Sequence, residues 1–281
     1  MSADTAQFAV RPQGLRPFLI DCDVLIRRNL TITARTPAMI LAIVLQPLMF
    51  VLVFSYVFGD ALGGDFYRQF LIGGVMAQTV TFNCAFSALG LATDLENGVM
   101  DRFRALPMSR LSVVAARCTS DIVINAVGLT VMSLAGLVVG WRIHTTFGEA
   151  IVGYLLALAF GFSMSWVGSL LGMVTSSFQA TQSLVTIVVF PMCFISSAFI
   201  PSRSLPAPLR AVANWNPVTS LARSLREGFG NPISAHTLIT EPRTWAALHP
   251  QVYTLLCCAV ILLLSIPLSM LLFRLRTRGG G

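Results

Sequence analysis

The sequence predicts an all-α integral membrane protein with six transmembrane helices. Its 281 residues are 55% hydrophobic and only 11% charged, and the mean hydropathy is +0.76. A soluble domain of this length needs more charge and less apolar surface. A second observation is that long runs of the chain carry no charge at all, and a charge at the centre of a bilayer is costly. Composition and charge spacing therefore place the chain among membrane proteins.

The segment 18–35 precedes the first uncharged run and is predicted to form an amphipathic helix. Apolar residues from Phe18 to Leu30 recur at helix-like intervals, while Asp21 and Arg27 hold other positions. Two placements fit this pattern: a helix lying in the cytoplasmic membrane interface, or one packed on a cytoplasmic partner. We expect residues 1–35 to form a cytoplasmic tail that includes this helix.

Uncharged runs locate the spans, because one crossing takes about 20 residues. The runs are 36–59, 69–93, 122–141, 150–202 and 244–273. The fourth run, of 53 residues, is long enough for two crossings, with a turn at the polar stretch 176–182. The expected transmembrane domain is 36–273, followed by a cytoplasmic tail at 274–281. Its spans are expected at about 38–58, 70–93, 113–140, 151–175, 182–200 and 251–273.

Arginine counts decide which side the termini occupy. All nineteen basic residues are Arg. With the N-terminus inside, twelve of them fall in cytoplasmic segments and seven fall outside. Cytoplasmic loops carry the excess of basic residues. The sequence therefore predicts a multi-pass protein of the cell (inner) membrane with both termini in the cytoplasm.

The long outer loop before the last span is predicted to hold two short extracellular helices. Leu209, Val212 and Trp215 share one helical face, and Asn216-Pro217 then interrupts the chain. A second apolar face follows at Val218, Leu221, Leu225 and Phe229. These helices fit either the outer membrane interface or a position dipping into it to cap a cavity.

Several kinds of chemistry are not expected in this chain. A P-loop requires a Lys on the nucleotide phosphates, and the chain has no Lys. Its six Cys show no CxxC spacing and fall mostly in apolar runs, so we interpret them as small core residues. The three His are far apart in sequence. We therefore expect no enzymatic activity, no catalytic residue, no metal site and no cofactor in this chain.

Residues 94–107, DLENGVMDRFRALP, form the most charged segment between two predicted spans. Five charges in fourteen residues suit a short helix at the cytoplasmic membrane face. Phe103 lies between Arg102 and Arg104, and an aromatic residue flanked by arginines is a typical interface anchor. The alternative is an ordinary solvated loop, which every six-span protein must have.

The order of these features resembles one family. The residues that carry the resemblance are Glu96, Gly98, Asp101-Arg102-Phe103-Arg104, Leu106-Pro107 and Asn216-Pro217-Val218-Thr219. With six spans, a lead-in helix and two outer helices, the chain resembles the permease subunits of ABC-2 type exporters. Within that family it is most similar to the daunorubicin-resistance permeases. The resemblance extends over nearly the whole chain.

The resemblance implies a division of labour with a separate ATPase. In this family the segment after the second span is a coupling helix that docks on the ATPase, which holds ATP and Mg, and the lead-in helix contacts the same partner. Permeases pair with a second copy or a sister permease, and substrates are often hydrophobic drugs, lipids or glycans. Gly98 and Pro107 would shape the coupling segment. The implied docking residues are Glu96, Asp101, Arg102, Phe103 and Arg104.

One carboxylate lies well inside an apolar stretch. Asp121 follows Arg117 by four residues, so both lie on one helical face and are predicted to form an ion pair. The competing interpretation is a proton relay at Asp121. A relay would support an alternative function, an ion-gradient-driven secondary transporter, which also requires a mid-membrane ionisable site or an inverted repeat.

Four amide side chains fall in the middle of predicted spans: Gln46, Gln78, Asn83 and Asn125. They fit a polar part of the substrate route, and they equally fit hydrogen bonds between helices. In the fourth span, Gly168 and Gly172 belong to a face of small residues. Such a face predicts close helix packing, within the subunit rather than at a dimer seam.

Overall fold

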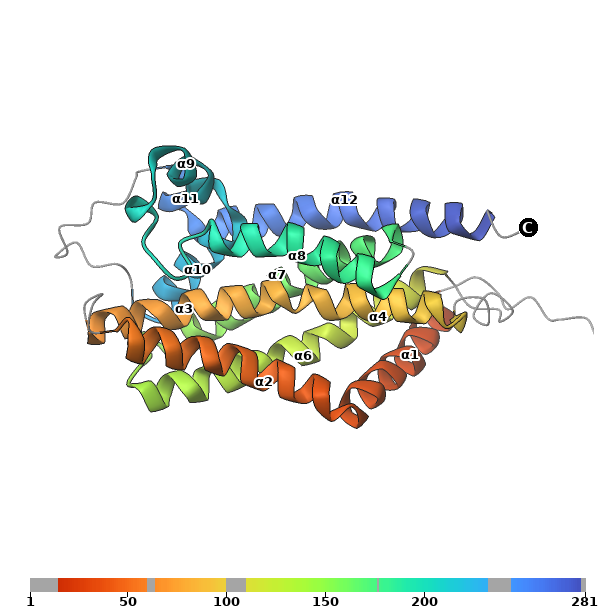
Figure 1. Ribbon diagram of the computed structural model, residues 1–281, viewed down its shortest axis with the longest axis horizontal. Coiled ribbons are helices and arrows are strands. Elements are labelled where there is room, and N and C mark those ends of the chain that lie inside the picture. Colours follow the sequence, from red (N-terminus) through yellow and green to blue (C-terminus); the bar gives the residue numbers. More distant parts are fainter. Residues whose placement is uncertain (1–14, 60–63, 100–109, 176, 232–243, 279–281) are drawn as a thin grey trace, which may run out of the picture.

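The computed structural model describes residues 15–59, 64–99, 110–175, 177–231 and 244–278. Within these ranges, every regular element is helical (Figure 1). The first half holds α1 (Leu15–Arg35), α2 (Pro37–Leu52), the π-helix η1 (Val53–Val57), α3 (Asp65–Phe82) and α4 (Cys84–Glu96). The second half holds α6 (Arg110–Val139), α7 (Phe147–Val174), α8 (Phe178–Phe194), the 3-10 turn η3 (Ser202–Ser204), α9 (Ala207–Trp215), α10 (Pro217–Gly228), α11 (Trp245–Leu248) and α12 (Pro250–Arg278).

Five helical segments of the described chain are long and apolar enough to cross a membrane. They are Pro37–Val57, Asp65–Glu96, Leu111–Val139, Phe147–Val174 and Pro250–Leu272. They correspond to five of the six predicted spans. The remaining one, expected at 182–200, is the shorter helix α8 of 17 residues followed by irregular chain. At 1.5 Å per residue α8 is about 25 Å long, less than the hydrocarbon core. The six-span layout therefore stays a prediction.

The helices run roughly along one axis, and the two ends of the molecule differ (Figure 1). One end carries α1, the end of α4 and the C-terminal end of α12. The other end carries the short helices α9 and α11. The first and last described helices therefore reach the same end of the molecule. Which side of the membrane this end faces stays a prediction.

Small residues of α7 pack directly against α4. A Cβ added at Gly168 would collide with the backbone carbonyl of Cys84, and one at Gly172 would collide with that of Ala88. Only glycine allows the two backbones to approach so closely. The predicted packing of this face within the subunit is confirmed.

The helix α10 is inserted into the protein rather than lying on its surface. All residues from Val218 to Arg226 are buried, and the helix packs between α3, α7 and α12. Its neighbour α9 instead exposes the apolar residues Leu209, Val212 and Trp215. The chain breaks between the two helices at Asn216, as the sequence predicts. This burial is within the protein, and the placement of α9 and α10 relative to the outer membrane interface stays a prediction.

The Asn216-Pro217-Val218-Thr219 motif ties α10 to the chain that leaves α8. The Asn216 side-chain oxygen accepts from the Val218 N–H at 2.9 Å and so caps α10. The amide nitrogen of Asn216 donates to the carbonyls of Met192 and Ile195. The Thr219 hydroxyl accepts from the Ser197 N–H at 3.0 Å. The motif thus holds the start of α10 against the end of α8 and the chain that follows it.

The cysteines pack as the sequence predicts. All six are free thiols, and every one except Cys257 is buried. Cys84 and Cys193 belong to the largest apolar cluster, while Cys22 and Cys118 belong to a second cluster beneath α1. The interpretation of these residues as core residues is confirmed.

Candidate functional site

The amphipathic helix α1 packs on α6 of its own chain. Cys22 and Leu25 are buried in an apolar cluster with Val114 of α6, whereas Leu19 and Val24 are exposed. Burial raises the pKa of the Cys22 thiol, and the neighbouring Asp21 carboxylate adds to this shift, so the thiol stays neutral. One apolar face of α1 is therefore covered by the protein, and another remains open to a membrane or a partner.

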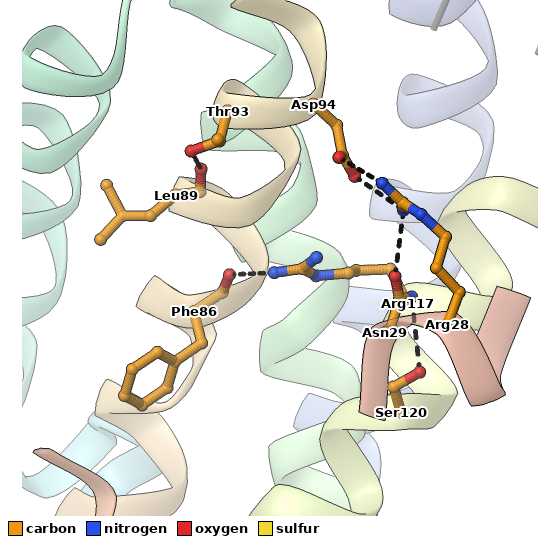
Figure 2. Close-up of polar contacts among 8 residues, drawn as sticks. All are labelled: Arg28, Asn29, Phe86, Leu89, Thr93, Asp94, Arg117 and Ser120. Carbon is orange, nitrogen blue, oxygen red and sulfur yellow. Dashed lines mark hydrogen bonds and ion pairs between the residues drawn. The ribbon is translucent and has the colours of Figure 1, made fainter. Parts of the chain in front are cut away.

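An ion pair joins α1 to the start of the charged segment (Figure 2). The Arg28 guanidinium contacts the Asp94 carboxylate through both terminal nitrogens, at 2.9 and 3.4 Å. The side chains are 31% and 16% exposed, so solvent screens the pair only in part. Next to it, the Asn29 amide donates to the Ser120 hydroxyl on α6 at 3.5 Å. Helices α1, α4 and α6 are thereby linked at one end of the molecule.

Glu96, the last residue of α4, contacts the start of α8. Its Oε1 accepts from the Phe178 backbone N–H at 2.7 Å. A carboxylate is favourable there, because the first N–H groups of a helix lack partners within it. Two residues on, Gly98 has a φ of 65°, a left-handed conformation that glycine adopts readily. Glu96 thus has a partner within the chain, and its docking role stays a prediction.

The remaining predicted docking residues lie outside the described residues. These are Asp101, Arg102, Phe103 and Arg104, together with Pro107, which was expected to shape the segment. The described chain stops at residue 99 and resumes at residue 110. The structure therefore describes only residues 94–99 of this segment, and the contacts of the rest stay a prediction.

Arg117 and Asp121 lie on one face of α6, as their spacing predicts, yet each contacts α4. The Arg117 Nη2 donates to the Phe86 carbonyl at 2.8 Å (Figure 2). The Asp121 carboxylate accepts from the Ser87 hydroxyl. No salt bridge between Arg117 and Asp121 occurs in the described part of the chain. Both nevertheless line one pocket below α1.

A glycine explains why Arg117 reaches across to α4. A Cβ at Gly90 would collide with the Arg117 guanidinium, so this side chain lies directly against the α4 backbone. The sequence spacing predicted a pair within α6, because it contained no information about the neighbouring helix. The structure thus shows two interhelical contacts that the spacing did not predict.

The four mid-span amides gather in one region. Gln46, Gln78 and Asn83 line a pocket between α2 and α3. Asn125 is outside this lining, but its Oδ1 accepts from the Asn83 Nδ2 at 2.8 Å. Asn83 occupies the short break between α3 and α4. Three of the amides line a pocket, as a polar part of a substrate route would require, and the Asn83–Asn125 pair forms a hydrogen bond between helices.

Comparison with known proteins identifies the family. Residues 21–229 match the ABC-2 type transporter family. The chain belongs to this family. It is 33% identical over 193 residues to the daunorubicin resistance ABC transporter permease protein DrrB1 of Streptomyces coeruleorubidus, an alignment covering 68% of each chain. The family assignment from the sequence motifs is confirmed.

More distant relatives of this ABC-2 chain also align over most of its length. The doxorubicin resistance ABC transporter permease protein DrrB of Mycobacterium tuberculosis is 27% identical over 198 residues, covering 70% of this chain and 67% of that one. The putative transport permease ycf38 of Porphyra purpurea is 23% identical over 217 residues, covering 75% and 74%. Both matches support a membrane permease component.

Sequence reasoning missed several contacts of this ABC-2 permease. It placed Asp94 in the charged segment and Arg28 on the amphipathic helix, but did not connect them. It did not single out Arg226, whose side chain is 2% exposed inside the protein. A usable signal was the apolar spacing around Arg226, which predicted a helix and left open whether that helix was inserted.

Proposed function

We propose that this chain is the transmembrane permease subunit of an ATP-driven ABC exporter. Its substrate is a hydrophobic or amphipathic molecule, such as a drug, lipid or glycan, taken from the cytoplasm or the inner leaflet. The observation that carries the proposal is the ion pair between Arg28 and Asp94. It joins the lead-in helix to the first residue of the 94–107 segment, which is the segment that the family resemblance assigns to ATPase docking.

The proposed subunit has six spans, with α8 and the chain after it forming the fifth. Both termini lie in the cytoplasm, and the protein resides in the cell membrane. It works with ABC ATPase subunits in trans, which bind ATP and Mg, and with a second copy or a sister permease. The position of α1, α4 and α12 at one end of the molecule supports this arrangement (Figure 1).

Force from the ATPase would enter through the 94–107 segment and α1 together. Because Arg28 and Asp94 are paired, displacement of the segment also displaces α1. Helix α1 continues into α2 with only Thr36 between them, and the segment continues backwards into α4 and α3. Helices α2 and α3 also flank the polar pocket. The arrangement therefore provides a mechanical route from the docking segment to a candidate substrate site.

The test is co-purification of the tagged chain from its native membrane in mild detergent, followed by mass spectrometry. We expect a stoichiometric Walker-containing ATPase, and its loss in the Phe103→Ala and Arg102→Glu variants. Arg210→Glu on α9, at the opposite end, is the matched control and should retain the ATPase. Absence of any ATPase in several detergents, or retention in both variants, would contradict the proposal.

The ion-gradient alternative makes a different prediction at Asp121. A proton-coupled transporter needs this carboxylate to exchange a proton during the cycle, whereas an ATP-driven one needs it only as a hydrogen-bond acceptor, as it is for Ser87. Flux in vesicles that depends on ATP and persists in Asp121→Asn would support the exporter. Flux driven by a pH gradient alone, and abolished in that variant, would support the alternative.

A further inference from the structure

The short helices α9 and α11 carry a patch of exposed apolar side chains. Both helices lie at the end of the molecule opposite to α1 and the C-terminal end of α12 (Figure 1). The α9–α11 patch consists of Leu209, Val212 and Trp215 on α9 and Trp245 and Leu248 on α11, each at least 40% exposed. Single exposed apolar residues are normal on a protein surface, whereas a group of them with two tryptophans marks an interaction surface.

Tyr253, close to the start of α12, joins the two halves of this patch. Its hydroxyl donates to the Trp215 carbonyl at 2.7 Å, and its ring meets the Trp215 ring edge-on with 5.9 Å between the ring centres. The Trp245 ring also packs edge-on against the Tyr253 ring, at 6.2 Å. Tyr253 therefore holds one tryptophan from each short helix beside the start of α12.

The start of α12 also marks a depth in the membrane. The apolar segment Pro250–Leu272 has 23 residues, so at 1.5 Å per residue it is about 34 Å long, close to the thickness of the hydrocarbon core. When this segment spans the bilayer, Tyr253 lies within about 5 Å of its end. Trp and Tyr concentrate at this level in membrane proteins, because their rings are apolar and their N–H or O–H groups are polar.

The α9–α11 patch continues into an exposed apolar face of α12. Val252, Leu255 and Leu256, which flank Tyr253 along this helix, are exposed as well. In a membrane-spanning helix such a face meets lipid. Residues 207–215 and 245–256 contain no acidic residue and only one basic residue, Arg210, so nothing in them repels lipid phosphates. Continuity and charge therefore favour lipid as the occupant of the patch.

We propose that α9 and α11 bind the boundary between headgroups and acyl chains in the lipid leaflet at this end of the molecule, with Trp215 and Trp245 as the anchoring side chains. Tyr253 fixes both rings at the depth of this boundary. Helix α9 then lies on the membrane surface, while α10, joined to it at Asn216, stays buried within the protein. The proposal requires only a membrane-spanning chain and does not depend on the exporter function.

Tryptophan fluorescence tests this placement, because the other two tryptophans, Trp141 and Trp166, are buried. The full chain is placed in nanodiscs whose phosphatidylcholine carries a nitroxide either near the ester carbonyls or near the middle of the acyl chain. The signal of the patch is the difference between the unmodified chain and the double variant Trp215→Phe with Trp245→Phe. We expect the shallow nitroxide to quench this signal about twofold more than the deep one, and aqueous iodide to quench it little.

A tryptophan at a known depth provides the matched control. Leu263 is exposed near the middle of α12, so the signal added by Leu263→Trp in the double variant should be quenched more by the deep nitroxide. The single variants Trp215→Phe and Trp245→Phe give the same difference signals one at a time, should the double variant fail to fold.

Three outcomes would overturn the proposal. Stronger quenching of the patch signal by iodide than by the shallow nitroxide would show that the patch faces water. Stronger quenching by the deep nitroxide would show that the tryptophans are inserted into the hydrocarbon core. Quenching by none of the three would show that a protein surface, such as a second copy of this chain, covers the patch.

Discussion

Arg226 contacts Phe70 in two ways inside the protein. Its Nε donates to the Phe70 carbonyl at 2.8 Å, and its guanidinium lies 3.5 Å from the centre of the Phe70 ring. The same guanidinium donates through Nη2 to the carbonyls of Ser197 and Ala198, at 2.8 and 3.0 Å. One buried side chain of α10 therefore connects α3 to the irregular chain after α8.

Removing this side chain should destabilise the fold. Arg226→Ala leaves three backbone carbonyls without their donor and is expected to lower the free energy of unfolding by about 3 kcal/mol. Arg226→Lys should recover only part of the loss, because an ammonium cannot reproduce the planar fork. Unfolding by denaturing detergent from mild micelles measures both effects.

Arg210 provides the control for this experiment. Within the described part of the chain, its guanidinium donates only to the nearby Leu205 carbonyl, so Arg210→Ala should change stability by less than about 0.5 kcal/mol. Equal losses of unfolding free energy in Arg226→Ala and Arg210→Ala would mean that the buried hydrogen bonds of Arg226 make no specific contribution to stability.

The Arg28–Asp94 pair should show a measurable coupling energy. A double-mutant cycle with Arg28→Ala and Asp94→Ala is expected to give about 1 kcal/mol, because the pair is partly buried and bidentate. The exposed pair of Arg27 with Asp23 on the same helix is a matched comparison and should couple more weakly. High salt should reduce the exposed coupling more than the partly buried one. A coupling near zero at Arg28–Asp94 would remove the structural basis for joint movement of α1 and α4.

The close approach of α7 to α4 should not tolerate a single added methyl group. Gly168→Ala places a Cβ against the Cys84 carbonyl, and we expect a loss of about 2 kcal/mol or more in unfolding free energy. Gly148→Ala, at the start of the same helix, meets open space and should be neutral or slightly stabilising. Similar behaviour of the two variants would contradict the packing described for α7.

Substitutions at Gly90 and Arg117 should have non-additive effects on stability, because the two residues are in direct contact. Gly90→Ala should displace the Arg117 guanidinium and lower the unfolding temperature. Combining it with Arg117→Ser should cost less than the sum of the single changes, because the colliding group is then absent. Strict additivity in the thermal measurement would argue against direct contact between these residues.

Local patterns along the chain predicted much of this architecture. The uncharged runs correspond to five helices of transmembrane length, and the interruption at Asn216-Pro217 separates α9 from α10. These features depend on the composition and spacing of neighbouring residues. Contacts at the candidate site were harder to predict, because Arg117 and Asp121 were close in sequence and their partners were not.

The sequence by itself determined the membrane class, the positions of most helices and the family, because hydrophobicity and helical periodicity act between residues near in sequence. Only the tertiary structure decided which side chains meet. Arg28 meets Asp94, Glu96 meets the start of α8, and Arg226 becomes an interior residue. These contacts join residues that are far apart along the chain. They depend on how closely helices approach, which at Gly90 and Gly168 is decided by the absence of a single methyl group.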